Sequence, residues 1–170
     1  HNGTVYFSNF ADQRLYCQRT GESPEALTPE VTPAAGLRYA DAVVDAPRKQ
    51  LICVMEDHRQ SGEAINAIAS IPFTGGLPKI LVSGNDFYSS PRLSPDGTQL
   101  AWITWNHPQM PWDGTELWLA NVKDDGSLSQ PRKLVGHVKE SVCQPQWSPG
   151  GALHFISDAT GWWNLYRWEG

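Results

Sequence analysis

Two acidic residues and a histidine stand together in Glu56-Asp57-His58, and these are residue types that exchange protons in general acid–base catalysis. They follow an apolar run that reads as a strand, and adjacent residues of a strand point to opposite sides. The three side chains are therefore not expected to converge, and a solvated loop entrance is the favoured interpretation. The sequence contains no Gly-x-Ser-x-Gly nucleophile elbow, no phosphate-binding glycine loop, no His-Glu-x-x-His motif and no dinucleotide fingerprint. We predict no catalytic residue, no cofactor and no metal site in this segment.

Aromatic residues in two turn-rich stretches form a second candidate. The first stretch is Trp105-Asn106-His107-Pro108-Gln109-Met110-Pro111-Trp112-Asp113-Gly114, and the second contains Gly161-Trp162-Trp163. Two prolines stiffen the first stretch and lower the entropy cost of presenting Trp112. Such rings either pad neighbouring elements or form a contact surface, since aromatic anchors dominate interfaces, and both interpretations stay open. The candidate residues for a surface that gates substrate or contacts another domain are Trp105, His107, Trp112, Trp162 and Trp163.

An internal repeat indicates which elements position these residues. The stretch Ser90-Pro91-Arg92-Leu93-Ser94-Pro95-Asp96-Gly97 matches Gln144-Pro145-Gln146-Trp147-Ser148-Pro149-Gly150-Gly151, and each reads as a short strand followed by a tight turn. An apolar run follows each turn, and two more strand-like segments complete the unit. The third segments are anchored on Leu15, Ala67, Leu117 and Leu165. A unit of about 50 residues with four strand-like segments has the size of a β-propeller blade.

The predicted fold class is all-β: a partial β-propeller of about four blades, each a four-stranded antiparallel sheet, with the first and last blades incomplete. The predicted blade units cover about 1–33, 34–87, 88–139 and 140–170. The first unit begins at its turn and the last ends before a fourth strand, which favours a piece of a longer chain. An uncovered blade face and open strand edges predict self-association. Because the aromatic stretches occupy the same place in their blades, we expect them on one face of the disc.

Composition limits the possible partners. A net charge of −5 argues against nucleic acid, because phosphate binding needs a basic surface. The longest apolar runs, such as residues 51–55, are too short to cross a membrane. Cys17, Cys53 and Cys143 lie far apart and form no metal-binding spacing, so free thiols in a reducing cytoplasm are expected rather than a disulfide.

Two longer runs resemble a known family. Trp105-Asn106-His107-Pro108, continued by Trp112-Asp113-Gly114-Thr115-Glu116-Leu117-Trp118, resembles the propeller of the prolyl oligopeptidase family, in particular its dipeptidyl aminopeptidase/acylaminoacyl peptidase branch. Ser157-Asp158-x-x-Gly161-Trp162-Trp163-Asn164-Leu165-Tyr166 strengthens the resemblance. The sequence departs from the usual pattern at Pro149-Gly150-Gly151, where Asp is more typical in the middle, and we expect this to loosen one turn.

The resemblance implies a division of labour. In such enzymes an N-terminal TolB-like propeller covers a C-terminal α/β-hydrolase domain, which carries the catalytic Ser, Asp and His, and the propeller admits peptides by size. The implied function is the substrate-gating segment of a cytoplasmic serine peptidase acting on short peptides. Its implied partners are the hydrolase domain of the same parent chain and the peptide substrate. The alternative is a non-enzymatic TolB-like propeller that binds protein partners.

Overall fold

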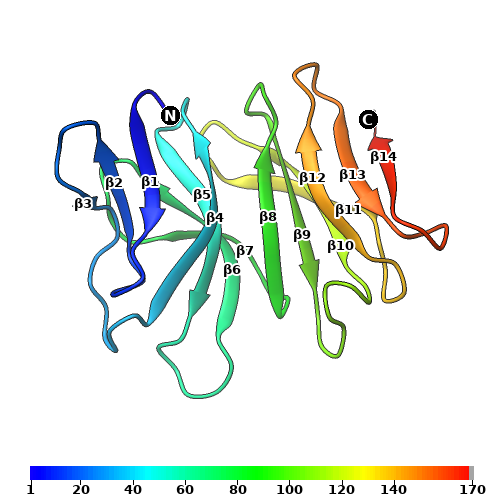
Figure 1. Ribbon diagram of the computed structural model, residues 1–170, viewed down its shortest axis with the longest axis horizontal. Helices are drawn as coiled ribbons and strands as arrows, with labels where there is room; N and C mark the ends of the chain where they lie inside the picture. The colour runs from blue at the N-terminus through cyan, green and yellow to red at the C-terminus, as the bar shows by residue number, and fades with distance from the viewer. Residues whose placement is uncertain (169–170) are drawn as a thin grey trace. The chain divides into compact units, whose positions relative to one another are not determined.

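Four antiparallel sheets make up the protein. The computed structural model describes residues 1–168, which form strands, turns and loops and contain no helix. Each sheet joins three or four strands that are consecutive in the chain, so every sheet is a simple meander (Figure 1). The all-β prediction is confirmed, including the incomplete first and last blades, which have three strands each. No helix that could span a membrane occurs within residues 1–168.

The sheets are called blades 1 to 4 in chain order. Blade 1 consists of β1 (Thr4–Ser8), β2 (Leu15–Arg19) and β3 (Glu25–Ala26). Blade 2 consists of β4 (Leu37–Asp45), β5 (Gln50–Asp57), β6 (Ile65–Pro72) and β7 (Lys79–Ser83). Blade 3 consists of β8 (Phe87–Leu93), β9 (Gln99–Trp105), β10 (Glu116–Val122) and β11 (Leu128–Val135). Blade 4 consists of β12 (Val142–Trp147), β13 (Leu153–Ser157) and β14 (Asn164–Trp168).

The turn between β8 and β9 shows why the repeated Ser-Pro-Asp-Gly sequence ends a strand. The carboxylate of Asp96 accepts hydrogen bonds from Ser94 Oγ at 2.6 Å and from the Thr98 amide at 3.0 Å. Ser94 Oγ accepts in turn from the Gln99 amide at 2.9 Å, which closes the turn. These bonds, that of Ser94 foremost, hold the pKa of Asp96 below its usual value, so the charged form of the side chain stabilises the turn.

The equivalent turn between β12 and β13 lacks this carboxylate. Gly150 stands at the position of Asp96, and the turn is closed by Ser148 Oγ, which accepts from the Ala152 amide at 3.0 Å. The Ser148 carbonyl also accepts a hydrogen bond from the Gly151 amide at 3.0 Å. The departure from the family pattern therefore removes side-chain hydrogen bonds and keeps the backbone turn.

The first strand of each four-stranded blade and of blade 4 contains a bulge. The pairing register shifts after Ala40 in β4, after Ser89 in β8 and after Cys143 in β12. The residue that follows each of these has a positive φ although it is not glycine: 51° at Asp41, 53° at Ser90 and 51° at Gln144. The matched Ser90-Pro91 and Gln144-Pro145 pairs thus mark a bulge inside a strand.

The chain divides into two compact units, His1–Ser83 and Gly84–Gly170. In the first unit, blades 1 and 2 share one apolar core, and in the second unit, blades 3 and 4 share another. The first core contains Leu15 from blade 1, Leu27 directly after β3, and Leu51 and Ile71 from blade 2. The second contains Ile103, Leu117 and Leu119 from blade 3 with Val142, Leu153 and Phe155 from blade 4. Adjacent blades therefore stand face to face within each unit.

Candidate functional site: the aromatic loops of the second unit

The predicted aromatic residues lie on or beside two loops of the second unit. Residues 106–115 connect β9 to β10, and residues 158–163 connect β13 to β14. Both loops join the second strand of a blade to the third, and they emerge at the same end of the strands in this unit (Figure 1). The shared meander topology of the two blades thus brings two aromatic stretches to one end of the two-blade unit, although they are about 50 residues apart in the sequence.

The first loop is anchored where it leaves β9. Asn106 Oδ1 accepts from the Asp86 amide at 2.8 Å, and Asp86 Oδ2 accepts from the His107 amide, also at 2.8 Å. Phe87, the first residue of β8, stacks on Trp105 with 5.2 Å between ring centroids and meets the edge of His107 at 5.0 Å. Two reciprocal hydrogen bonds and two ring contacts therefore fix the start of the loop on its own blade.

The far part of this loop folds into a turn. The Asp113 amide donates to the Met110 carbonyl at 2.8 Å, and the Met110 amide donates to Asp113 Oδ2 at 3.1 Å. Gly114 lies directly against the segment that links blades 3 and 4, since a Cβ at this position would meet the His137 carbonyl oxygen at 2.6 Å. Only a glycine permits this close approach of two backbones.

Trp112 sits between these fixed points with 63% of its surface exposed. Met110, in the same loop, is exposed as well. Large apolar side chains on a loop that is held in place by backbone and side-chain hydrogen bonds are typical of recognition surfaces, because little conformational entropy remains to be lost on binding.

The second loop presents two further rings. Trp162 is 80% exposed and Trp163 51%. The loop is held by the Asn164 side chain, whose Nδ2 donates to Thr160 Oγ1 at 2.9 Å and to the Trp162 carbonyl at 3.0 Å. At its start, the Gly161 amide donates to the Asp158 carbonyl at 2.8 Å. Asn164 thus closes the loop around the two tryptophans.

The structure divides the five predicted residues into two groups. Trp105 is partly buried, packs against the core of the second unit and stacks on Phe87, a placement that fits the padding interpretation. His107 is exposed, and its ring rests on the same phenylalanine. Trp112, Trp162 and Trp163 project from the two loops and have the exposure that a contact surface requires.

Sequence inspection missed the residues that join the two loops. Ser141, which lies in the segment between blades 3 and 4, donates from Oγ to the Pro111 carbonyl at 2.5 Å and from its amide to Asp158 Oδ1 at 2.8 Å. The Glu140 carbonyl accepts from the Thr115 amide at 3.0 Å, and its carboxylate accepts from Ser157 Oγ at 2.7 Å. No sequence motif marks this Glu-Ser pair, because its role depends on two loops that only the fold brings together.

The acid–histidine stretch at the end of β5 does not form one site. Glu56 and His58 do meet: Glu56 Oε2 lies 2.9 Å from His58 Nε2, and His58 stands directly after the last residue of β5. Asp57 points elsewhere and accepts from Arg59 Nη2 at 2.7 Å, and this hydrogen bond is the main reason why the pKa of Asp57 lies below its usual value. Glu56 also lines a pocket of about 240 Å³ together with Gln13, Arg38, Tyr39, Ala40 and Val54.

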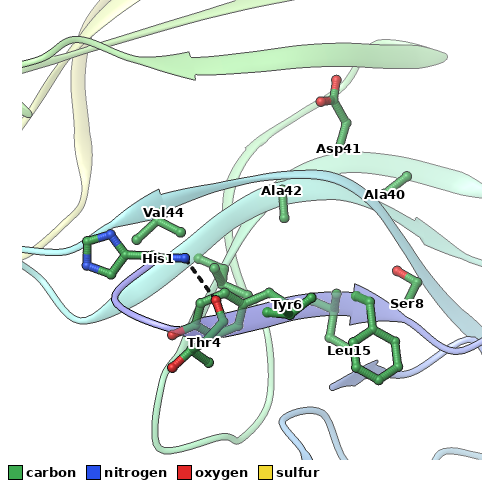
Figure 2. Close-up of a pocket in the computed structure, with 12 residues that line it drawn as sticks. His1, Thr4, Tyr6, Ser8, Leu15, Ala40, Asp41, Ala42 and Val44 are labelled. Atoms are coloured by element: carbon green, nitrogen blue, oxygen red, sulfur yellow. Dashed lines mark hydrogen bonds between the residues drawn. The ribbon is translucent and has the colours of Figure 1, made fainter. Parts of the chain in front are cut away.

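A groove of about 440 Å³ lies between β1 and β4 in the first unit (Figure 2). It includes a histidine, a serine and an aspartate, the residue types of a hydrolytic triad. Figure 2 shows His1 at one end of the groove and Ser8 near the other, while Asp41 points away from both. Ser8 Oγ donates to the Tyr39 carbonyl at 2.6 Å, so it is engaged in joining blade 1 to blade 2. The groove therefore does not assemble a nucleophile and a base.

The three thiols are free, and no cluster of metal-ligating side chains is found within residues 1–168. Burial raises the pKa of Cys53 to about 12, which keeps this thiol protonated and unreactive at neutral pH. Burial, followed by the nearby charge of Asp158, also raises the pKa of Cys143.

Comparison with known proteins relates the chain to peptidases. No family model and no curated protein sequence matches it. Among solved structures, a puromycin-hydrolysing peptidase of Mycobacterium tuberculosis is 42% identical with a TM-score of 0.89, and the match covers 96% of this chain and 27% of that one. A mutant puromycin hydrolase in complex with PGG is 36% identical with a TM-score of 0.89, and the match covers 98% and 27% of the two chains. The chain thus spans about a quarter of the length of these peptidases.

A more distant comparison concerns the fold alone. The β-propeller domain of the Trilobed protease from Pyrococcus furiosus matches 78% of this chain and 43% of its own, with 14% identity and a TM-score of 0.50. Together with the four meander sheets, this match identifies the architecture as part of a β-propeller.

Proposed function

The chain is a β-propeller segment of the prolyl oligopeptidase family, and we propose that it serves as the substrate-gating part of a serine peptidase that acts on short peptides. In this proposal an α/β-hydrolase domain of the same parent chain carries out the chemistry. The propeller segment restricts access by size and orients the peptide. The sequence contains no nucleophile elbow, in keeping with a division of labour between two domains.

The exposure of the loop tryptophans is the observation that supports this role most. Trp112 and Trp162 are large, apolar and exposed, yet they stand on loops that hydrogen bonds hold in place. Burying such rings against a peptide or a neighbouring domain is favourable by about 25 cal/mol per Å² of apolar surface. We therefore assign Trp112, Trp162 and Trp163 to the face toward the hydrolase domain or the substrate, with His107 beside them.

The first test compares the segment with its parent chain in aminopeptidase and acyl-peptide hydrolysis assays. Activity in the parent alone, abolished by a serine-directed inhibitor, is the expected result. Activity in neither chain would contradict the proposal and favour a TolB-like propeller that binds protein partners without catalysis.

The second test changes Trp112 to Ala in the parent peptidase. We expect KM to change with the length of the peptide while kcat for the shortest substrates stays near its original value, because an indole ring offers contact surface and neither a nucleophile nor a proton-transfer group. Leu77→Ala provides a control, since Leu77 is 71% exposed but lies in the loop between β6 and β7 of the first unit. Equal kinetics of both variants at every peptide length would remove Trp112 from the proposed surface.

Two further properties belong to the same proposal. The free thiols Cys17, Cys53 and Cys143 fit a reducing cytoplasm. Val5 on the edge strand β1 and Leu165 on the edge strand β14 are exposed apolar residues, and we propose that the 170-residue chain self-associates through such edges. Small-angle scattering that gave a monodisperse monomer would contradict the self-association.

A further inference from the structure

We propose that the Glu140-Ser141 pair locks the two aromatic loops of the second unit into one recognition element. The loops are residues 106–115 and 158–163, and the pair belongs to the segment that links blades 3 and 4. Glu140 and Ser141 act as positioning residues: they touch neither substrate nor reacting atoms, but they set the position of Trp112 relative to Trp162. The inference rests on the proposed function in one respect, namely that these tryptophans contact peptide or the hydrolase domain.

Every polar group of Ser141 is bonded to one of the two loops. Its hydroxyl donates to Pro111, the residue before Trp112, at 2.5 Å. Its amide donates to the carboxylate of Asp158 at 2.8 Å, and its carbonyl accepts from the Asp158 amide at 3.2 Å. The residue is only 1% exposed, so water cannot replace these partners without opening the structure.

Glu140 repeats the same division between the loops. Its carbonyl accepts from the amide of Thr115, where the first loop enters β10, at 3.0 Å. Its carboxylate accepts from Ser157 Oγ, where the second loop leaves β13, at 2.7 Å. Ser157 Oγ also accepts from the Ala159 amide at 3.1 Å, which extends the connection into the second loop. Two adjacent residues thus hold both loops, each through both backbone and side-chain groups.

The arrangement couples the loops mechanically. If the first loop moved away from its position, the Ser141 hydroxyl would lose Pro111, and the close contact of Gly114 with the His137 carbonyl would open. If Ser141 followed the loop, it would pull on Asp158 through two hydrogen bonds. Because Trp112 directly follows Pro111, a displacement of either loop changes the relation between the rings.

Hydrogen–deuterium exchange of the 170-residue chain tests the coupling itself. We expect Ser141→Ala to raise amide exchange in both loops, by roughly five- to tenfold, since it removes about one net hydrogen bond. The matched control is Ser148→Ala, which removes a turn hydrogen bond at the opposite end of β12 and should leave both loops unchanged. Faster exchange in only one loop, or in neither, would overturn the proposal.

The Asp158 variants keep the test valid if Ser141→Ala fails to fold. Asp158→Ala removes the acceptor of the Ser141 amide, whereas Asp158→Asn retains an oxygen at that place. We expect Asp158→Ala to raise exchange in residues 106–115, a loop to which the Asp158 side chain is connected through its hydrogen bond with Ser141. Asp158→Asn should restore most of the protection. Equal behaviour of the two variants would refute a connection through this hydrogen bond.

A double-mutant cycle in the parent peptidase tests the use of the coupling. With Ser141 present, Trp112→Ala and Trp162→Ala should be non-additive in KM, the double variant losing at least threefold less than the product of the single effects. In the Ser141→Ala background the effects should multiply. If the effects of the two tryptophan substitutions on KM multiplied in both backgrounds, the proposal that the loops act as one recognition element would be wrong. If neither tryptophan affects any peptide substrate, the proposed function fails, and the exchange experiment still decides the coupling.

Discussion

The backbone contact at Gly114 leads to a specific prediction for the change Gly114→Ala. An added Cβ would lie 2.6 Å from both the His137 carbonyl oxygen and the Val138 carbonyl carbon, and 2.7 Å from the Val138 oxygen. Ordinary contacts begin at about 3.4 Å, so the loop and the segment between blades 3 and 4 must separate by about 0.8 Å. All of these atoms belong to the backbone, and no side-chain rotation can relieve the overlap.

The expected cost is that of overpacking, about 1–3 kcal/mol in the free energy of unfolding. For a chain of this size, a change of 1 kcal/mol lowers Tm by about 2–4 °C. We expect a decrease of Tm by about 2–12 °C in thermal denaturation followed by circular dichroism, at a protein concentration low enough to suppress association. Hydrogen exchange should rise in residues 106–115 because the displaced loop loses its anchor.

Gly150→Ala is the matched control. Gly150, like Gly114, lies outside the left-handed region of φ, but its added Cβ meets only Ser148 Oγ, at 4.0 Å. Replacing a glycine without strain stabilises by about 0.4–1 kcal/mol, because the unfolded chain loses freedom. Opposite signs for the two variants are therefore expected. If Gly114→Ala were as stable as Gly150→Ala, the loop would not be held against its neighbour, and the reasoning on the loop anchor would be wrong.

Three further predictions concern turns. Gly150→Asp should raise the free energy of unfolding by about 1 kcal/mol in urea denaturation, because the new carboxylate can accept from the Ser148 hydroxyl as Asp96 accepts from Ser94. A Gly150→Asp variant no more stable than Gly150→Ala would contradict this. Asp96→Ala should lower the free energy of unfolding by about 1 kcal/mol near pH 7 and by much less near pH 2. The pKa of Asp96 is lower in the folded than in the unfolded protein, so its carboxylate stabilises the fold above the unfolded value of about 3.9, and this stabilisation is lost as pH falls through the folded pKa. A loss of stability independent of pH would refute the carboxylate's role. Asp45 is 0% exposed and accepts from Arg48 at 3.1 Å, so Asp45→Ala should cost about 3 kcal/mol in the free energy of unfolding, against less than about 0.5 kcal/mol for the exposed control Asp124→Ala. Equal stability of these two variants would exclude a structural role for the buried carboxylate.

The strands could be predicted because their signals are local. Pro95-Asp96-Gly97 combines the residues that a tight turn requires, and the apolar run that follows has the length of one strand. The same order of turn and strand recurs about every 50 residues, so a strand that is ambiguous in one unit can be assigned by comparison with the other units. Long buried stretches in β5 and β9 fit the expectation for strands covered on both faces.

The bulges could not be predicted for a physical reason. A positive φ at Asp41, Ser90 or Gln144 is unfavourable for each residue by itself, and nothing in the residue type requires it. The conformation is imposed by the pairing with β5, β9 or β13, which resumes in a shifted register after the bulge. A proline follows the positive-φ residue in β8 and in β12, but in β4 this position is Ala42, so the proline does not mark all three bulges.

The same limit applies to the candidate site. Trp105 and Trp112 lie in one stretch and have the same side chain, so the sequence offers no way to separate a padding role from a contact role. The difference comes from Phe87, which stacks on Trp105 because β8 pairs with β9. Trp112 has no such partner among the ring contacts of residues 1–168. Exposure is decided by neighbours that are distant in sequence.

The joining of loops through the segment between two blades follows from the topology and occurs in both units. In a four-stranded meander, the segment that leads to the next blade crosses the end where the loops between second and third strands emerge. In the first unit, Thr28 in this segment accepts on its carbonyl from Arg14 Nε at 2.7 Å, and Gly36 accepts on its carbonyl from the His58 amide at 2.7 Å. These contacts lie eight residues apart, whereas the second unit concentrates them in the adjacent Glu140 and Ser141. Because the connection is shorter in the second unit, we expect a displacement of one loop to be passed to the other more directly there, as the proposed joint role of the two exposed tryptophans requires.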